Sequence, residues 1–326
     1  MGKLAVALFG LMFALGAGLV VHARRPAPAP PLRLGLNPWA GYEFLFLARE
    51  KGYFAEEGVD VRLVEFSSVE DARRAYEHNQ LDGIASSMVN MLLTRAESRR
   101  EPQAFLVADA SNGVDMLVAG PGVRDLADLR GKRIGIERAA PGLLVLGRAL
   151  DKAGLRLGDV DVRVMDLEKM PEAMRTGAVD AAVCYPPIST DLARAGGRVL
   201  FTSAAIPGEI VDAFFFDRRV LEARPREAAA IVRAWDKALE FAVRNPAEAY
   251  RSMARRMLVS EPEVREQLEG IQILRSRDQR RLFARGGKLD GVVGRLDEMA
   301  RALGLVSGPN HTGDIVARQP VLWGTR

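Results

Sequence analysis

Hydrophobic and polar residues near the start of the chain follow the order expected of a strand, a helix and a second strand. Residues 32–36 form a short apolar run that ends before Pro38, because proline lacks the backbone donor of a strand ladder. Residues 42–51 carry apolar side chains at helical spacing, and Gly52 follows at the usual helix stop. Residues 59–64 alternate again. This pattern predicts a βαβ unit with parallel strands.

The same order recurs later in the chain. In the first of two matching segments a helix is expected to end at Asn79 and a strand to follow Asp82. In the second, the helix is expected to end at Gly177 and the strand to follow Asp180. Asparagine and glycine both tolerate the positive φ of a helix end. We interpret both aspartates as structural turn residues. The repetition predicts two α/β lobes built on one plan. Residues 32–37, 59–63 and 79–85 correspond in this way to residues 132–137, 160–164 and 177–183.

The remaining pattern changes character at Pro225. Before it, strands and helices are mixed, with residues 109–115 expected to form a loop; after it, only helices are expected, and residues 306–326 show no helical periodicity. Further strands are predicted at residues 81–86, 104–108, 116–119, 182–185, 199–202 and 210–217. Further helices are predicted at residues 69–79, 88–98, 189–195, 227–244, 246–257, 261–268 and 289–303.

Composition fits two globular domains. The chain has 326 residues, 48% of them hydrophobic, and a formal charge of +4. Its basic residues are spread among acidic ones, so we expect no nucleic-acid partner, which would need a concentrated basic face. We also expect a monomer. The single cysteine, Cys184, lies in an apolar strand and is expected to be a buried, inert thiol.

The first 23 residues are typical of an export signal. Lys3 precedes an apolar run over residues 4–21, and Ala23 provides a small residue at the cleavage position. The alternative is an uncleaved anchor, whose length barely spans a bilayer core. Either reading places the body in the periplasm, free or tethered to the inner membrane. Residues 24–31, rich in proline, are expected to form a stiff tether.

Catalytic motifs are absent from the sequence. The three histidines, His22, His78 and His311, have no partner at ligand spacing, so neither a zinc site nor a Ser-His-Asp arrangement is expected. The phosphate-binding pattern GxxxxGKS or GxxxxGKT, the GxSxG elbow and GxGxxG do not occur. We therefore expect no enzyme activity, no metal and no cofactor.

Polar and aromatic residues gather in the predicted strand-to-helix loops, at the carboxyl ends of parallel strands, where open α/β sheets bind ligands. Each has a structural alternative: Ser67 and Ser68 could cap a helix, Trp39 and Tyr42 could anchor one, and the aspartates could be solvated. The predicted ligand-binding residues are Asn37, Trp39, Tyr42, Ser67, Ser68, Ser86, Ser87, Asn112 and Asp115 in the first lobe, with Glu137, Tyr185 and Asp212 completing the set.

Three motifs in this order, AREKGYF at residues 48–54, GKRIGIE at 131–137 and GAVDAAV at 177–183, carry a family resemblance. Over residues 32–305 the chain resembles the periplasmic solute-binding proteins of the nitrate, sulfonate and taurine type, a family that also contains thiamine-pyrimidine-precursor binders. The resemblance implies a two-lobed periplasmic-binding-protein fold of type II, with a small-molecule solute held between lobes and delivered to the membrane subunits of an ABC importer. The implied lobes are residues 32–115 with 213–305, and residues 116–212, followed by a C-terminal tail at 306–326.

The side chains at the loop ends favour one class of solute. Carboxylates beside aromatic rings suit an amine or a nitrogen heterocycle through charge-assisted hydrogen bonds and cation–π contact. Arg138 alone offers a cation at these loops. A sulfonate, taurine or nitrate solute stays open, because helix N-termini and hydroxyl groups can hold anions. Two further alternatives are an enzyme on the same scaffold and a membrane-tethered sensor.

The export signal gives the first testable prediction. Because a signal peptidase cleaves after small residues, mass spectrometry of the protein from its native envelope should show a chain that begins at Arg24. An intact Met1 terminus in the membrane fraction would instead support the anchored form.

Overall fold

The computed structural model describes residues 29–137, 141–302, 304, 306–308 and 312–319. The chain divides into two compact units, residues 1–31 and 32–326. In the first unit, residues 29–31 are described and have no regular secondary structure. The predicted signal at residues 1–23, together with Arg138 and His311, lies outside the described residues. Among those described, no helix combines the length and the apolar character needed to cross a membrane.

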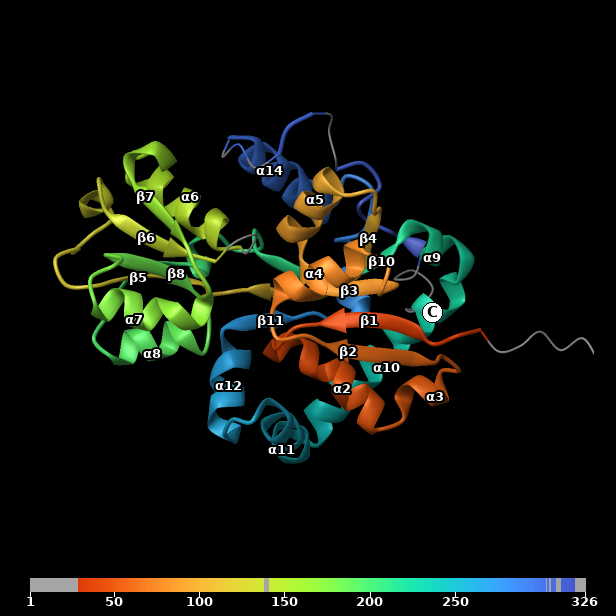
Figure 1. The fold of residues 1–326 in the computed structure, drawn as a ribbon. Helices are drawn as coiled ribbons and strands as arrows, with labels where there is room; N and C mark the ends of the chain where they lie inside the picture. Colours follow the sequence, from red (N-terminus) through yellow and green to blue (C-terminus); the bar gives the residue numbers. More distant parts are fainter. Residues whose placement is uncertain (1–28, 138–140, 303, 305, 309–311, 320–326) are drawn as a thin grey trace, which may run out of the picture. The chain divides into compact units, whose positions relative to one another are not determined.

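A six-stranded sheet organises the first lobe (Figure 1), in the order β11-β4-β10-β3-β1-β2. Strand β1 pairs in parallel with β2 and β3, whereas β10 runs antiparallel to both β3 and β4, and β11 runs antiparallel to β4. The strands are β1 (Leu32–Leu36), β2 (Val61–Glu65), β3 (Gly83–Ser87), β4 (Pro102–Ser111), β10 (Val211–Asp217) and β11 (Ile271–Ile273).

A five-stranded sheet organises the second lobe, in the order β7-β6-β8-β5-β9. Strand β6 pairs in parallel with β7 and β8, and β5 runs antiparallel to β8 and β9. The strands are β5 (Met116–Ala119), β6 (Arg133–Ile136), β7 (Asp161–Val164), β8 (Ala181–Cys184) and β9 (Arg198–Thr202). Mixed sheets with helices on both faces confirm the predicted two-lobed α/β fold.

Helices cover both faces of each sheet (Figure 1). In the first lobe, α2 and α3 pack with α10 on one face, and α4, α5 and α14 lie on the other. In the second lobe, α6 covers one face and α7 and α8 the other. The helices are α2 (Glu43–Glu50), α3 (Tyr53–Glu56), α4 (Val69–Glu77), α5 (Met88–Glu97), α6 (Gly142–Lys152), α7 (Met170–Arg175), α8 (Ile188–Arg194), α9 (Arg218–Ala223), α10 (Pro225–Arg244), α11 (Pro246–Met257), α12 (Glu261–Glu269), α13 (Ser276–Gln279) and α14 (Lys288–Ala302).

The sequence repeat corresponds to a repeated three-dimensional unit. Asn79 and Gly177 both have positive φ, 61° and 70°, where the preceding helices end. Asp82 accepts from the backbone and the guanidinium of Arg33, at 2.8–3.0 Å. Asp180 accepts from the same three nitrogens of Arg133, at 2.9–3.0 Å. Each pair ties the start of a lobe's first parallel strand to the turn before its neighbour, so both aspartates have a structural role.

Strand β10 forms the centre of the first lobe's core. Its three consecutive phenylalanines are fully buried, because the strand lies between two others and both its faces are covered by helices. Phe214 and Phe216 pack with Trp235 and the α2 face, and Phe215 packs with the α4 and α5 face. The side-chain period of two along a strand explains this division.

Two expectations are wrong, and the C-terminal tail adds a contact that the sequence does not predict. The region after Pro225 is not purely helical, because Ile271–Ile273 forms the edge strand β11, too short for a periodic signal. Residues 109–115 are not all loop, since β4 continues to Ser111. Part of the tail pairs with the sheet: the backbone of Ala104 bonds on both sides of Val316, at 2.7 Å. The lobe boundaries drawn from the sequence stay a prediction.

Because β10 lies at the centre of the core, a methyl group added on the neighbouring strand should destabilise the fold. A Cβ on Gly83 would lie 2.2 Å from the Phe215 backbone oxygen, so Gly83→Ala should lower the free energy of unfolding by about 1–3 kcal/mol. Gly135→Ala, also in a strand, meets only ordinary contacts at 3.4 Å or more and serves as the matched control. Urea denaturation of both variants measures the difference; equal stability would contradict the packing described.

Candidate functional site

A cleft lies at the edge where the parallel strands of both sheets end. The space in it that is open to water is about 50 Å³. A wider groove of about 660 Å³ adjoins it and shares Asn37, Val69, Glu137 and Tyr185 with it. The cleft is lined by Asn37, Trp39, Tyr42, Val69, Ser87, Asn90, Asp115, Glu137, Pro141, Tyr185, Ile210 and Asp212.

Strand direction explains why these residues meet. Asn37, Glu137 and Tyr185 directly follow the parallel strands β1, β6 and β8. Asp115 and Asp212 do not follow parallel strands, which corrects the sequence-based expectation for them. Asp115 precedes β5 and Asp212 is the second residue of β10, and both strands run antiparallel to their neighbours. The amino end of an antiparallel strand lies at the same edge as the carboxyl ends of parallel strands, so the aspartates reach the cleft.

The first wall is built around Trp39. Its indole Nε1 donates to the Oδ2 atom of Asp109 at 3.0 Å, and Asp109 is completely buried behind the wall. A Cβ on Gly41 would lie only 2.0 Å from this Oδ2 atom. Glycine at position 41 therefore lets the backbone of η1 (Ala40–Tyr42) approach the carboxyl group closely.

The second wall is contributed by the second lobe and meets the first through aromatic rings. The Tyr185 hydroxyl donates to Glu137 Oε2 at 3.0 Å. The rings of Trp39 and Tyr185 lie edge to face, with centroids 6.0 Å apart and an interplanar angle of 83°. Such a pair stabilises by about 0.5–1.5 kcal/mol beyond area burial. Residues of both lobes thus contact one another across the cleft.

Three aspartates form an acidic cluster: Asp115 and Asp212 line the cleft, and Asp109 lies buried behind its wall. Asp109 and Asp212 are register partners on β4 and β10. Burial raises the pKa of Asp109 to about 7 and that of Asp115 to about 6. Burial, with repulsion from the other two carboxylates, raises the pKa of Asp212 well above its usual value. Desolvation and like charge both disfavour ionisation here.

Donors near the cluster are few and already bonded. Tyr42 makes a side-chain hydrogen bond with Asp212, and Ser111 makes one with Asp115. Burial also raises the pKa of the Tyr42 hydroxyl and of Glu137. Among the described residues that line the cleft there is no lysine or arginine. The described cleft is therefore a desolvated acidic site with aromatic walls.

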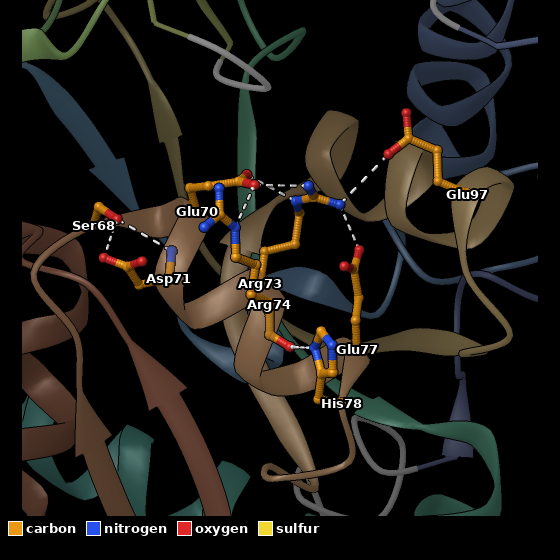
Figure 2. A network of polar contacts seen from close by, with 8 residues as sticks. All are labelled: Ser68, Glu70, Asp71, Arg73, Arg74, Glu77, His78 and Glu97. Atoms are coloured by element: carbon orange, nitrogen blue, oxygen red, sulfur yellow. Dashed lines mark hydrogen bonds and ion pairs between the residues drawn. The ribbon is translucent and has the colours of Figure 1, made fainter.

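Four residues predicted from the sequence lie elsewhere. Ser68 caps α4 by accepting from the Asp71 backbone at 3.1 Å (Figure 2), and Ser67 bonds the same aspartate at 3.1 Å. Both serines line the wider groove rather than the cleft. Ser86 is buried beneath the cleft against Asn90, and Asn112 is exposed. Ser68 is therefore a helix cap, which is the structural alternative given for it in the sequence analysis.

Two polar residues at the site, Asp109 and Asn90, were missed in the sequence analysis. Asp109 lies within an apolar stretch of β4, and its position had been assigned to a loop. A charged residue in the middle of an apolar run could have indicated the site. Burying a charge costs free energy, so charged residues are rarely buried unless they are paired or functional. Asn90 lies in the first turn of α5, where its buried side chain carries no periodic signature.

Other reactive groups in the described residues are inert. Cys184 is buried as predicted, and burial raises the pKa of its thiol to about 12. Over residues 29–137, 141–302 and the described parts of the tail, no group of three or more histidine, cysteine, aspartate or glutamate side chains is arranged to hold a metal ion.

Comparison with known proteins identifies the family. The model of the NMT1-like family matches residues 25–258, most of the chain. The chain belongs to the NMT1-like family. A Brucella abortus relative of this NMT1-like protein, named "Putative binding protein", is 26% identical over 286 residues, 86% of this chain and 88% of the relative.

Solved structures with the same fold include binding proteins and an enzyme. The alkanesulfonate-binding protein SsuA from Xanthomonas axonopodis pv. citri, bound to MOPS, has a TM-score of 0.72 at 18% identity and covers 89% of this chain and 99% of its own. The desulfurization enzyme DSZB has a TM-score of 0.64 at 14% identity and covers 90% and 99%. These matches confirm the periplasmic-binding-protein fold, and identities this low carry the fold alone. The family resemblance is confirmed by the family model.

The acidic cluster predicts how stability depends on pH. A carboxyl group with a higher pKa in the folded than in the unfolded protein binds its proton more tightly when folded, so stability falls as pH rises from the unfolded to the folded pKa. For Asp109 these values are 3.8 and about 7. Tm of the ligand-free protein should therefore fall between roughly pH 4 and pH 7.

Substitution separates this effect from other titrating groups. Asp109→Asn should flatten the fall in Tm, because the buried side chain can no longer ionise. Asp278→Asn, at an exposed position, should leave the slope unchanged. A wild-type Tm that stays constant or rises over this interval would show that the cluster does not titrate as described.

Proposed function

We propose that this protein is an exported solute-binding protein that holds a small cationic or nitrogen-rich organic solute, an amine or a nitrogen heterocycle, and delivers it to an ABC importer. The observation that carries the proposal is that Asp115 and Asp212 line the cleft, with Asp109 buried behind them, and that the described lining has no basic side chain. Buried carboxylates without a countercharge are unfavourable, and a bound cation would relieve that cost.

The aromatic walls support the same class of solute. Trp39, Tyr42 and Tyr185 line the cleft beside the carboxylates, and a cation near an aromatic face gains about 0.5–2 kcal/mol. Each aromatic polar group is bonded to a carboxylate, which leaves the ring surfaces for the solute. Asn37 and Ser87 are proposed as polar contacts of the same site.

Binding between the lobes supports transport. We propose that residues 32–115 with 213–305 form one closing lobe and residues 116–212 the other, with the two crossovers as the hinge. The Trp39–Tyr185 contact joins the two lobes directly at the cleft. We further propose a monomer in the periplasm that contacts the membrane subunits of its importer and no nucleic acid.

A sulfonate solute is the second candidate, favoured by the fold shared with SsuA. Helix N-termini and hydroxyl groups could hold such a solute, and Arg138, which directly follows Glu137 in the sequence, could add a cation. The shared fold of DSZB similarly keeps an enzyme as an alternative. The acidic character of the described lining counts against an anionic solute, because like charges repel in a desolvated site.

A ligand screen with charge-neutralising variants tests the proposal. Thermal shift of the mature protein against amines, pyrimidines, sulfonates and nitrate identifies the best ligand, and a ligand at a hundred times its Kd stabilises by about 2.7 kcal/mol. For a cation, Asp115→Asn and Asp212→Asn should each weaken binding by roughly 2–5 kcal/mol in calorimetry, because each removes a paired charge.

The control for the carboxylate variants is again Asp278→Asn, which is exposed and lies on α13. A sulfonate as the best ligand, bound with unchanged affinity by both cleft variants and lost in Arg138→Gln, would overturn the cationic proposal in favour of the second candidate.

A further inference from the structure

Two amide oxygens of the cleft have no hydrogen-bond donor. Asn37 Oδ1 and Asn90 Oδ1 are both buried atoms without a partner, and both residues line the cleft. Asn90 as a whole is 2% exposed. Their amide nitrogens are already bonded, that of Asn37 to the Pro38 carbonyl at 3.2 Å and that of Asn90 to Ser86 Oγ at 3.3 Å. The Asn37 bond fixes the orientation of its amide, because a carbonyl oxygen can only accept. Each amide nitrogen keeps one further N–H, and the two oxygens are the buried atoms without a partner.

The neighbouring side-chain donors are committed to carboxyl groups. Trp39 Nε1 donates to Asp109 and the Tyr185 hydroxyl to Glu137, each at 3.0 Å. The Tyr42 hydroxyl interacts with Asp212. These three side chains donate to neither amide oxygen, so Asn37 Oδ1 and Asn90 Oδ1 stay buried without a donor.

The unpaired amide oxygens narrow the chemistry of the solute further than charge alone does. A buried acceptor without a donor is costly, so a solute that binds tightly must supply donors as well as positive charge. We infer, building on the proposed function, that the solute's charged group is a guanidinium, an amidinium or a similar cation with several N–H donors, and that a quaternary ammonium is rejected. A quaternary ammonium satisfies the charge but leaves both amide oxygens unpaired.

The free space of the cleft agrees with a compact charged group. It is about 50 Å³, enough for only a few water molecules. The adjoining groove of about 660 Å³ shares Asn37 and Glu137 with the cleft. A substituent on the cation can extend into this groove without displacing the charged group.

Three probes of similar size separate charge from donor capacity. Methylguanidinium has both, tetramethylammonium has the charge without N–H donors, and N-methylurea has N–H donors without the charge. Calorimetry of the mature protein should give methylguanidinium an affinity at least about tenfold above each of the other two, as expected for hydrogen bonds to a charged donor.

Variants then connect the preference to the two asparagines. Asn90→Ala and Asn37→Ala should each weaken methylguanidinium binding by about tenfold and leave the response to tetramethylammonium unchanged. Asn245→Ala, at an exposed helix junction, is the matched control and should change neither. Asn37 is partly exposed, so its variant tests the inference even if Asn90→Ala fails to fold.

The outcomes distinguish this inference from the proposed function. Equal affinity for methylguanidinium and tetramethylammonium, or full affinity in both asparagine variants, would overturn the N–H requirement while leaving a cation-binding protein. Binding of ethanesulfonate with no response to any cation would overturn both.

Discussion

The position of β10 is the constraint on which the rest of the structure depends. The chain returns from the second lobe and inserts this strand antiparallel between β3 and β4, which separates the three parallel strands β1, β2 and β3 from β4 and the edge strand β11. Its phenylalanines then fill the core on both faces, while Asp212 is carried to the cleft. Core packing and solute contact are consequently properties of one seven-residue segment. A shift in its register would disturb both, because side chains alternate faces along a strand.

The acidic cluster at the cleft is electrostatically unfavourable, and the rest of the fold holds its carboxyl groups together. Three carboxyl groups with raised pKa values oppose folding when they ionise, and the surrounding structure compensates through a small number of specific contacts. The Trp39 indole supplies one bond to Asp109, and Gly41 permits the close approach that this bond needs. Raised pKa values of this kind, which cost local stability, are common at functional sites.

Most of the fold follows from local patterns, whereas the site depends on pairing between distant segments. Periodicity located the strands at Leu32–Leu36 and Met116–Ala119 and the helix at Pro246–Met257, because the signal lies within each segment. The inward position of Asp109 depends instead on β10 and Trp39, which are remote in sequence. The directions of β5 and β10, which bring Asp115 and Asp212 to the cleft, are likewise set by the sheets and leave no local trace.

The paired contacts Arg33–Asp82 and Arg133–Asp180 lie at the amino ends of the parallel strands, at the edge of each sheet opposite to the cleft. The contacts that stabilise the repeated unit and the residues of the candidate site thus lie at opposite ends of the strands. Substitutions among the cleft loops leave these bidentate contacts untouched. Such a separation allows specificity to diverge in evolution while the scaffold is retained, and it makes the cleft loops a natural target for redesign toward other solutes.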